Sequence, residues 1–174
     1  MSKIKAFFLD RDGIINIDNG YVFRQNDFIF NEHIFDVLKY LQKKDFYFFI
    51  VTNQSGIGRG IYSEQDFINL NNWMINEFLR HKIKISSVKF CPHNPNIDCD
   101  CRKPKTGMFK KIKKNFNNLD LNKSWMIGDK ESDILFAINS GIKNTIFLRN
   151  DKYYLNSVVP DFTVDSIIKI KEII

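Results

Sequence analysis

Short apolar runs alternating with segments of helical periodicity are the feature that most restricts the fold of this chain. The runs are rich in β-branched and aromatic residues and indicate buried strands at 5–9, 46–51, 88–90, 125–127 and 145–148. Between them, apolar residues recur at helical spacing within 34–41, 67–78, 108–116 and 133–140. This alternation predicts a Rossmann-like α/β fold, with an open, mainly parallel sheet and helices on both faces.

Residues with preferences for helix ends support these boundaries. Ser63 and Thr106 are predicted N-caps, and Gly141 follows the fourth helical segment as a C-terminal stop. A short strand near Phe162 and a closing helix from Asp165 are expected after an irregular stretch.

Length and charge limit the classes of protein to consider. At 174 residues, the chain 1–174 is predicted to form a single domain, and a monomer is expected. Apolar runs such as 46–51 fall far short of the roughly 20 residues that cross a bilayer, and the N-terminus resembles a buried strand rather than a secretion signal. A cytoplasmic location without a membrane partner is therefore expected.

The net charge of +6 favours acidic partners such as phosphorylated metabolites or nucleic acid. The lysines are scattered, whereas nucleic-acid binders cluster their charge, and the densest run, 110–114, is predicted to be a solvated helix face. We therefore expect no nucleic-acid partner, although a zinc-stabilised nucleic-acid-binding module remains an alternative interpretation.

Polar motifs follow the ends of the predicted strands, where open α/β sheets bind their ligands. The residues concerned are Asp10 and Asp12, Thr52 and Asn53, Cys91 and His93, and Asp129.

The first of these motifs, FLDRDGIIN, places two carboxylates at the end of a strand. There Asp10 is a candidate nucleophile toward phosphorus and Asp12 a candidate proton carrier, although an ordinary Asp-Gly turn at Gly13 would look the same. Asp129, in IGDKESD, adds a hard oxygen ligand, so that Asp10 and Asp129 would suffice for Mg²⁺. Asp133 adds a further carboxylate to the same edge, or it only begins the following helix, where an acid favours the helix dipole; the two roles are compatible.

Two further motifs supply groups that bind phosphate. VTNQSGIGRG (51–60) offers Thr52, Asn53 and backbone N–H groups, and CRKPKTGM offers Arg102 and Lys103. The alternatives are a plain Ser/Gly-rich connection and two surface cations.

A cysteine-rich loop, CPHNPNIDCDC (91–101), contains all three cysteines of the chain and one histidine. Cys91, His93, Cys99 and Cys101 are expected to bind zinc as a closed set of four ligands, which is typical of a structural site; the alternative is a loop with scattered cysteines. A disulfide is not expected in a reducing compartment.

Together these motifs resemble the haloacid-dehalogenase-type phosphatases, over nearly the whole chain from Phe8 to about Leu148. The combination DRDGIIN, DNGYV, TNQSGIGRG, CPH…CDCRKPKTGM and GDKESD is similar to the D-glycero-D-manno-heptose 1,7-bisphosphate 7-phosphatases, which supply heptose precursors for lipopolysaccharide or surface glycans. The histidinol-phosphate phosphatases of histidine biosynthesis share the zinc loop.

The resemblance implies roles for individual residues. Asp10 would attack the ester and form an aspartyl-phosphate, and Asp12 would protonate the leaving oxygen and then activate water. Mg²⁺ would be held by Asp10, Asp129 and the backbone carbonyl of Asp12, while Thr52 and Lys103 steady the phosphoryl group. The substrate site would be lined by Asp18, Asn19, Gly20, Tyr21, Asn53, Gln54, Ser55, Arg59, Arg102 and Lys130.

Spacing and motif details refine this expectation. The intervals between motifs leave no room for a cap domain, so short loops must select the substrate. DNGYV and SGIGRG favour the heptose substrate, whereas the five-residue gap between His93 and Cys99 resembles the histidinol-phosphate type. A phospho-accepting signalling switch is disfavoured, because Asp12 would speed loss of the acyl phosphate.

Overall fold

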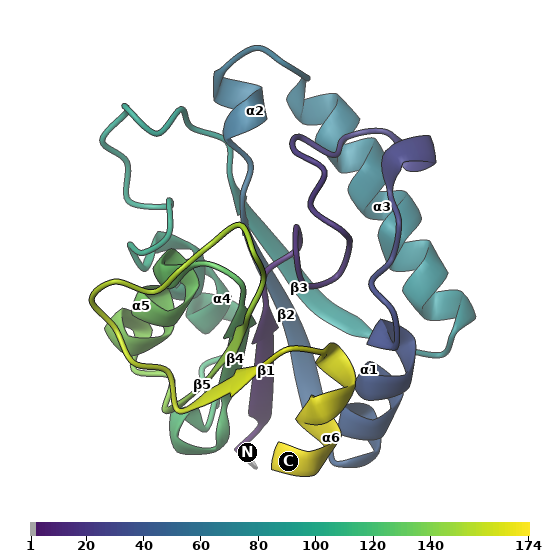
Figure 1. Cartoon of the computed structure of the whole chain (residues 1–174), viewed down its shortest axis with the longest axis vertical. Helices are drawn as coiled ribbons and strands as arrows, with labels where there is room; N and C mark the ends of the chain where they lie inside the picture. The colour runs from purple at the N-terminus through teal and green to yellow at the C-terminus, as the bar shows by residue number, and fades with distance from the viewer. Residues whose placement is uncertain (1–2) are drawn as a thin grey trace.

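Six parallel strands form the centre of the molecule in the computed structural model, which describes residues 3–174 (Figure 1). The strands are β1 (Lys5–Leu9), β2 (Phe46–Asn53), β3 (Ile85–Cys91), β4 (Trp125–Gly128), β5 (Asn144–Leu148) and β6 (Phe162–Val164). Their order across the sheet is β3-β2-β1-β4-β5-β6, and every neighbouring pair is parallel. The predicted α/β fold is confirmed, with a sheet that is wholly rather than mainly parallel.

The helices cover both faces of this sheet, as predicted. They are α1 (Ile34–Lys43), α2 (Ser55–Gly58), α3 (Glu64–Arg80), α4 (Gly107–Asn115), α5 (Glu131–Ser140) and α6 (Ile170–Ile173), with short 3₁₀ turns at Gln25–Asp27, Leu121–Lys123 and Ile167–Lys169. Within residues 3–174, no additional domain is inserted between the strands.

Successive side chains along a strand point to opposite faces of the sheet, so the buried apolar residues form two separate cores, one on each face. Phe7 and Leu9 of β1 point to one face and pack with the apolar residues of α1 and α3. Ala6 and Phe8 point to the other face and pack with α4 and α5. Because both faces are covered, β1 is apolar along almost its whole length instead of alternating with polar residues.

Two boundaries differ from the prediction. β3 begins at Ile85 rather than at residue 88, because this edge strand is only half-buried over Ile85–Phe90 and its polar residues hid it from an apolar pattern. The closing helix is a 3₁₀ turn followed by the four-residue α6, and not a helix starting at Asp165.

The predicted helix ends behave differently from one another. Ser63 caps α3, since its hydroxyl accepts a hydrogen bond from the N–H of Asp66 at 3.1 Å and the Asp66 carboxylate accepts one from the N–H of Ser63 at 2.8 Å. Thr106 occupies the N-cap position of α4 but makes no side-chain capping bond. Gly141 ends α5 with a φ of 76°.

This contrast predicts a measurable difference in stability. Ser63→Ala is expected to lower the free energy of unfolding by about 1 kcal/mol, the usual value of an N-cap hydrogen bond. Thr106→Ala is the matched control and should change it by less than about 0.5 kcal/mol. Urea unfolding of the two variants measures both values, and equal losses would contradict the capping assignment.

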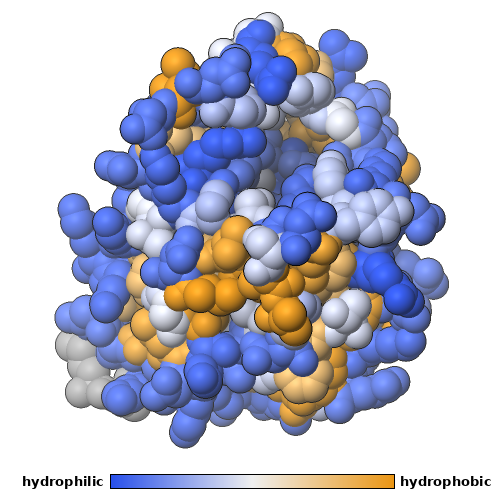
Figure 2. Space-filling view, turned by 60° about the vertical axis from the view of Figure 1, so that its left-hand side comes forward, coloured by the Kyte–Doolittle hydropathy of each residue, from blue (hydrophilic) through white to orange (hydrophobic). Residues whose placement is uncertain are grey.

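The surface is largely polar, and the largest apolar area on the face turned forward in Figure 2 lies near its middle. Exposed apolar side chains include Tyr154, Val159 and Phe162, which belong to β6 or to the segment before it. No helix within residues 3–174 has the length and apolar character that a membrane crossing requires.

Candidate active site

Three buried carboxylates meet where the strand order reverses between β1 and β4. Asp10 follows β1, Asp129 follows β4, and Asp133 lies in the first turn of α5. One oxygen of each lies within 4.8 Å of the others, and the three residues are at most 4 % exposed. The edge predicted to carry the chemistry therefore does bring Asp10 and Asp129 together.

Glycines make this close approach possible. A Cβ at Gly13, whose φ is +95°, would lie 2.2 Å from Oδ2 of Asp129. A Cβ at Gly128 would lie 2.2 Å from the Cβ of Asp133. Any larger side chain at either position would push a carboxylate out of the cluster.

Lys103 is the cation buried among these carboxylates. Its Nζ lies 2.8 Å from Oδ1 of Asp10 and 2.6 Å from Oδ1 of Asp133, and it donates a hydrogen bond to the carbonyl of Val51 at 2.7 Å. Asn53 fixes the Lys103 backbone, accepting from its N–H at 2.9 Å and donating to its carbonyl at 3.2 Å.

Asp133 therefore serves both interpretations considered for it. One oxygen pairs with Lys103, and the other accepts a hydrogen bond from the Lys130 N–H at 3.0 Å at the start of α5. Its contact with Lys103 was not predicted, since the sequence gives no sign that two motifs 30 residues apart meet there.

The electrostatics of the cluster favour an added cation. Burial, reinforced by the charge of Asp10, raises the pKa of Asp129 to about 8. Burial also raises the pKa of Asp10, against the opposing effect of Lys103. Oδ1 of Asp129 is buried and has no hydrogen-bond partner among residues 3–174. The carboxylates of Asp10 and Asp129, with one unsatisfied buried oxygen, fit a site for Mg²⁺, while both oxygens of Asp133 are engaged by Lys103 and the Lys130 N–H.

Asp12 is held by a hydrogen-bond network of its own. The Arg11 guanidinium, itself 1 % exposed, donates to both carboxylate oxygens, at 2.7 and 2.8 Å. Asn16 donates at 3.0 Å and Gln54 at 2.9 Å. Tyr62 in turn fixes Gln54 through a hydrogen bond of 2.6 Å. Sequence reasoning predicted Asp12 and Gln54 but missed Arg11, Asn16 and Tyr62, whose types alone suggest no role.

A cavity of about 290 Å³ opens beside Asp12. Its lining consists of Asp12, Asp18, Gly20, Tyr21, Asn53, Gln54, Ser55, Tyr62, Lys130 and Tyr153. Most of the residues predicted for the substrate site therefore line one cavity. Tyr62 and Tyr153 also line it, although the sequence analysis did not predict them.

Other predicted substrate residues lie outside this lining. Thr52 is buried beneath the cavity, and its hydroxyl accepts a hydrogen bond from Gln54 at 2.8 Å. Asn19 and Arg59 are exposed on their loops. Arg102 is half-buried, and its Nη1 is buried without a hydrogen-bond partner among residues 3–174.

The four predicted zinc ligands gather at the end of β3, whose last residue is Cys91. Sγ of Cys91 lies 3.5 Å from Nδ1 of His93, 3.6 Å from Sγ of Cys99 and 2.8 Å from Sγ of Cys101. All four ligand atoms lie within 4.8 Å of one another, and the three thiols are free.

Burial raises the pKa of the Cys91 and Cys101 thiols. Burial acts in the same direction on Cys99, but hydrogen bonds from the Arg102 N–H and neighbouring ligand groups outweigh it and lower the pKa of Cys99 to about 7. Because thiolates bind metal, a cluster in which two thiols resist ionisation alone would be stabilised by a cation. The Cys/His cluster could therefore hold a metal ion.

Comparison with known proteins defines the class. The family model described as polynucleotide kinase 3 phosphatase matches residues 3–154. The crystal structure of D,D-heptose 1,7-bisphosphate phosphatase from B. bronchiseptica, complexed with magnesium and phosphate, shares the fold, with a TM-score of 0.83 over 97 % of both chains at 23 % identity. The family match, the fold and the carboxylate cluster together define a phosphatase of the haloacid-dehalogenase type.

Curated relatives narrow this class. The D-glycero-alpha-D-manno-heptose-1,7-bisphosphate 7-phosphatase of Campylobacter jejuni is 45 % identical over 150 residues, covering 86 % of each chain. The D-glycero-beta-D-manno-heptose-1,7-bisphosphate 7-phosphatase of Haemophilus ducreyi is 44 % identical over 157 residues, covering 85 % of each chain. The chain belongs to the family of heptose 1,7-bisphosphate 7-phosphatases, as its motifs predicted.

Proposed function

We propose that this chain removes the 7-phosphate of D-glycero-D-manno-heptose 1,7-bisphosphate in a magnesium-dependent reaction that passes through an aspartyl-phosphate. The observation that carries the proposal is Asp10, held by Lys103 within a cluster of buried carboxylates, close to a cavity lined by Asp12. The relatives' names support the substrate, and because they include both anomers the proposal covers the heptose without choosing one.

Asp10 is the nucleophile in this reaction. Lys103 engages its Oδ1, which leaves the second oxygen to attack phosphorus as the bond to the sugar oxygen breaks. The ammonium of Lys103 and the hydroxyl of Thr52 stabilise the charge on the phosphoryl oxygens. Asp10, Asp129 and the backbone carbonyl of Asp12 would hold Mg²⁺, which would add positive charge at the phosphoryl group.

Asp12 moves the protons. It donates a proton to the departing sugar oxygen, and it then takes one from the water that attacks the aspartyl-phosphate and releases phosphate. The hydrogen bonds from Arg11, Asn16 and Gln54 fix its carboxylate at the cavity wall, so it is already in place for both steps.

The substrate's sugar and its second phosphate are bound by the loops around the cavity. Lys130 is the cation in the lining, and Arg59 and Arg102 are additional cations on the neighbouring loops. Without a cap domain these loops select the substrate.

The position of cleavage tests this proposal. The product made from the 1,7-bisphosphate should keep its anomeric phosphate, which ³¹P NMR distinguishes from a primary phosphate by its coupling to the sugar protons. Loss of the 1-phosphate, or of both phosphates at similar rates, would contradict the proposed orientation of the substrate.

We propose further that Cys91, His93, Cys99 and Cys101 bind one structural zinc ion. Four N and S ligands with no open position are the arrangement that zinc takes in such sites. The loop they would fix contacts the glycine loop, where the Gly58 N–H donates to the carbonyl of Pro92 at 2.8 Å. Zinc would thus support the loops around the cavity without taking part in the reaction.

Zinc content and stability test this second proposal. Protein purified without chelators is expected to contain about one zinc per chain, and Cys99→Ser should lose the metal. The free energy of unfolding should fall by at least about 2.7 kcal/mol, the contribution of a ligand present at a hundred times its Kd. Asp98→Asn, an exposed position in the same loop, is the control and should keep both zinc and stability. The zinc assignment would be contradicted if the wild-type protein, purified without chelators, contained no zinc and if Cys99→Ser had the same free energy of unfolding as the wild type.

A further inference from the structure

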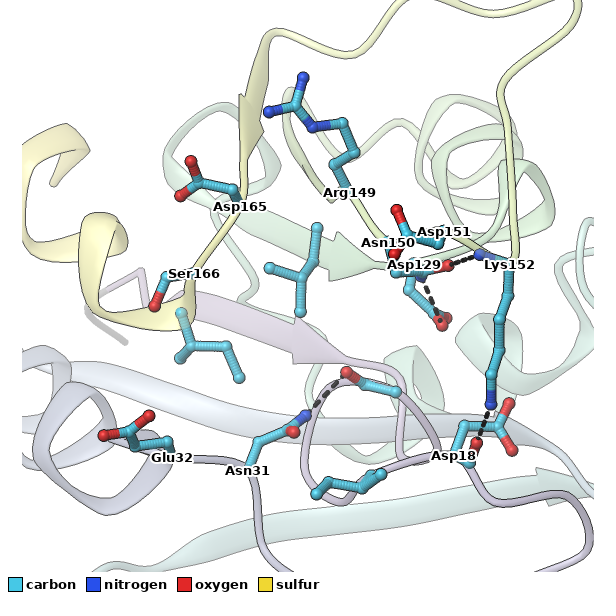
Figure 3. A pocket seen from close by; sticks show the side chains of 14 residues that line it. Asp18, Asn31, Glu32, Asp129, Arg149, Asn150, Asp151, Lys152, Asp165 and Ser166 are labelled. Carbon is cyan, nitrogen blue, oxygen red and sulfur yellow. Dashed lines mark hydrogen bonds between the residues drawn. The ribbon is translucent and has the colours of Figure 1, made fainter.

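The segment that follows β5 links the carboxylate cluster to the substrate cavity. A second cavity, of about 380 Å³, lies next to the first and is shown in Figure 3. Asp129 and Asp18 line it together with residues 148–152, and Asp18 also lines the substrate cavity. Asp18 therefore forms part of the wall between the two.

Asn150 makes contacts in two directions from one side-chain amide. Its Nδ2 donates a hydrogen bond to Oδ2 of Asp129 at 3.2 Å. Its Oδ1 accepts from the backbone N–H of Lys152 at 2.8 Å (Figure 3). The same oxygen accepts from the backbone N–H of Tyr153 at 3.0 Å, and the two bonds close a turn.

The turn directs two side chains to Asp18. Nζ of Lys152 donates to the carbonyl of Asp18, as Figure 3 shows, and the Tyr153 hydroxyl donates to Oδ2 of Asp18 at 3.3 Å. Lys130 completes the group, with its Nζ 3.2 Å from Oδ2 of Asp18 and 4.5 Å from the centre of the Tyr153 ring. Asp18, Lys130 and Tyr153 together form one wall of the substrate cavity.

We propose that Asn150 is a positioning residue that couples the metal site to the substrate wall. Its NH₂ group orients the Asp129 carboxylate for Mg²⁺, and its oxygen holds the turn that places Tyr153 against Asp18 and Lys130. Partners that orient metal ligands in this way often change metal affinity when they are replaced. The inference rests on the proposed function in taking Asp129 as a ligand of Mg²⁺ and the Asp18 wall as part of the substrate site.

The test uses two measurements that need no substrate. Binding of Mg²⁺ alone is measured by titration calorimetry, and opening of the turn is measured as the rate of tryptic cleavage after Lys152, identified by mass spectrometry. Asn150→Ala is expected to weaken Mg²⁺ binding by about 10- to 100-fold. It should also speed cleavage by about tenfold, because both turn hydrogen bonds are lost and cleavage follows local opening.

Two further variants separate a positioning role from general damage. Asn150→Ser keeps a short acceptor for the turn but cannot reach Asp129, so it should weaken Mg²⁺ binding while cleavage stays near the wild-type rate. Asn156→Ala is the matched control in the same segment, because the exposed Asn156 side chain donates a hydrogen bond to the half-buried Glu131 at 3.5 Å and, within residues 3–174, to no residue of the metal site or of the Asp18 wall. Its thermal midpoint, Mg²⁺ affinity and cleavage rate should equal those of the wild type.

An Asn150→Ala protein that matches Asn156→Ala in Mg²⁺ affinity, in cleavage rate or in both would overturn the coupling. Faster tryptic cleavage of Asn150→Ala in Mg²⁺-free buffer at sites throughout the chain, and not mainly after Lys152, would overturn it as well, because a general loss of stability would then explain both effects. Failure of the proposed substrate is a separate result, visible as a wild-type chain that binds Mg²⁺ but releases no phosphate from the heptose bisphosphate.

Discussion

Replacing Asp10 by asparagine is expected to lower phosphate release by about 10⁴-fold or more, since hydrolases that lose a covalent nucleophile commonly lose this much. The amide has nearly the same shape as the carboxylate but cannot form the acyl phosphate. Fold and stability should survive, because burial already raises the pKa of Asp10, so a neutral side chain suits the site, and Lys103 keeps its contacts with Asp133 and Val51. Phosphate release with saturating Mg²⁺ and thermal unfolding measure the two effects.

Asp36→Asn is the matched control for this variant. Asp36 lies on α1 with an exposed carboxylate, so its neutralisation changes the net charge equally without touching the site. Its rate should equal that of the wild type. Turnover by the Asp10 variant within tenfold of this control would remove Asp10 from the role of nucleophile.

Lys103→Met is expected to be the most destabilising single change at the site. The methionine fills a similar volume but leaves Asp10 and Asp133 without their buried cation, and removing one partner of a buried ion pair typically costs about 3–5 kcal/mol. Activity should fall with stability, because the same ammonium is proposed to contact the phosphoryl group. Urea unfolding at pH 7 without Mg²⁺ measures the loss.

The pH dependence of this loss follows from the carboxylates. Burial raises the pKa of Asp10 and Asp129, and Lys103 opposes that rise at Asp10, so the pKa of Asp10 should be higher still in the Lys103→Met variant. The folded variant then binds more protons than its unfolded chain, and its unfolding free energy falls more steeply with rising pH than that of the wild type. The difference in unfolding free energy between the wild type and Lys103→Met should therefore be smaller at low pH, where the carboxyl groups are protonated. It should also be smaller in excess Mg²⁺. Lys105→Met, which breaks an exposed pair with Asp98, is the control and should have little effect. Equal losses in the two variants would show that Lys103 is not the countercharge of the cluster.

The fold could be predicted from the sequence because each buried strand carries a strong local signal. β1, β2, β4 and β5 are nearly continuous apolar runs, and the turns that follow them contain the motif residues. The apolar pattern predicts too short a β3, because it leaves out polar residues such as Ser86 and Ser87. These residues belong to the strand because β3 lies at the edge of the sheet, where polar side chains are tolerated. Thr106 met the sequence rule for an N-cap, but no local rule specifies whether the hydroxyl reaches a backbone N–H.

The sequence predicts those residues of the candidate site that belong to recognisable motifs. It does not predict the residues that reach the site from distant segments of the chain. Asp10 and Asp129 follow neighbouring strands, so sheet topology alone predicts their contact. Tyr62, Asn150 and Tyr153 reach the site from segments whose composition resembles that of ordinary loops. The bond between Asn150 and Asp129 spans two strand ends, and only three-dimensional packing reveals it.

Side-by-side kinetics on two substrates test the central claim most directly. Purified protein with Mg²⁺ is given D-glycero-D-manno-heptose 1,7-bisphosphate or histidinol phosphate, and kcat/KM for phosphate release is compared. We expect the bisphosphate to be preferred by about 10²-fold or more, because the cations proposed to bind its second phosphate would gain no such partner from a substrate that has one phosphate. Equal rates, or a preference for histidinol phosphate, would contradict the proposed substrate and would point to the short loop between His93 and Cys99 as the element that selects it.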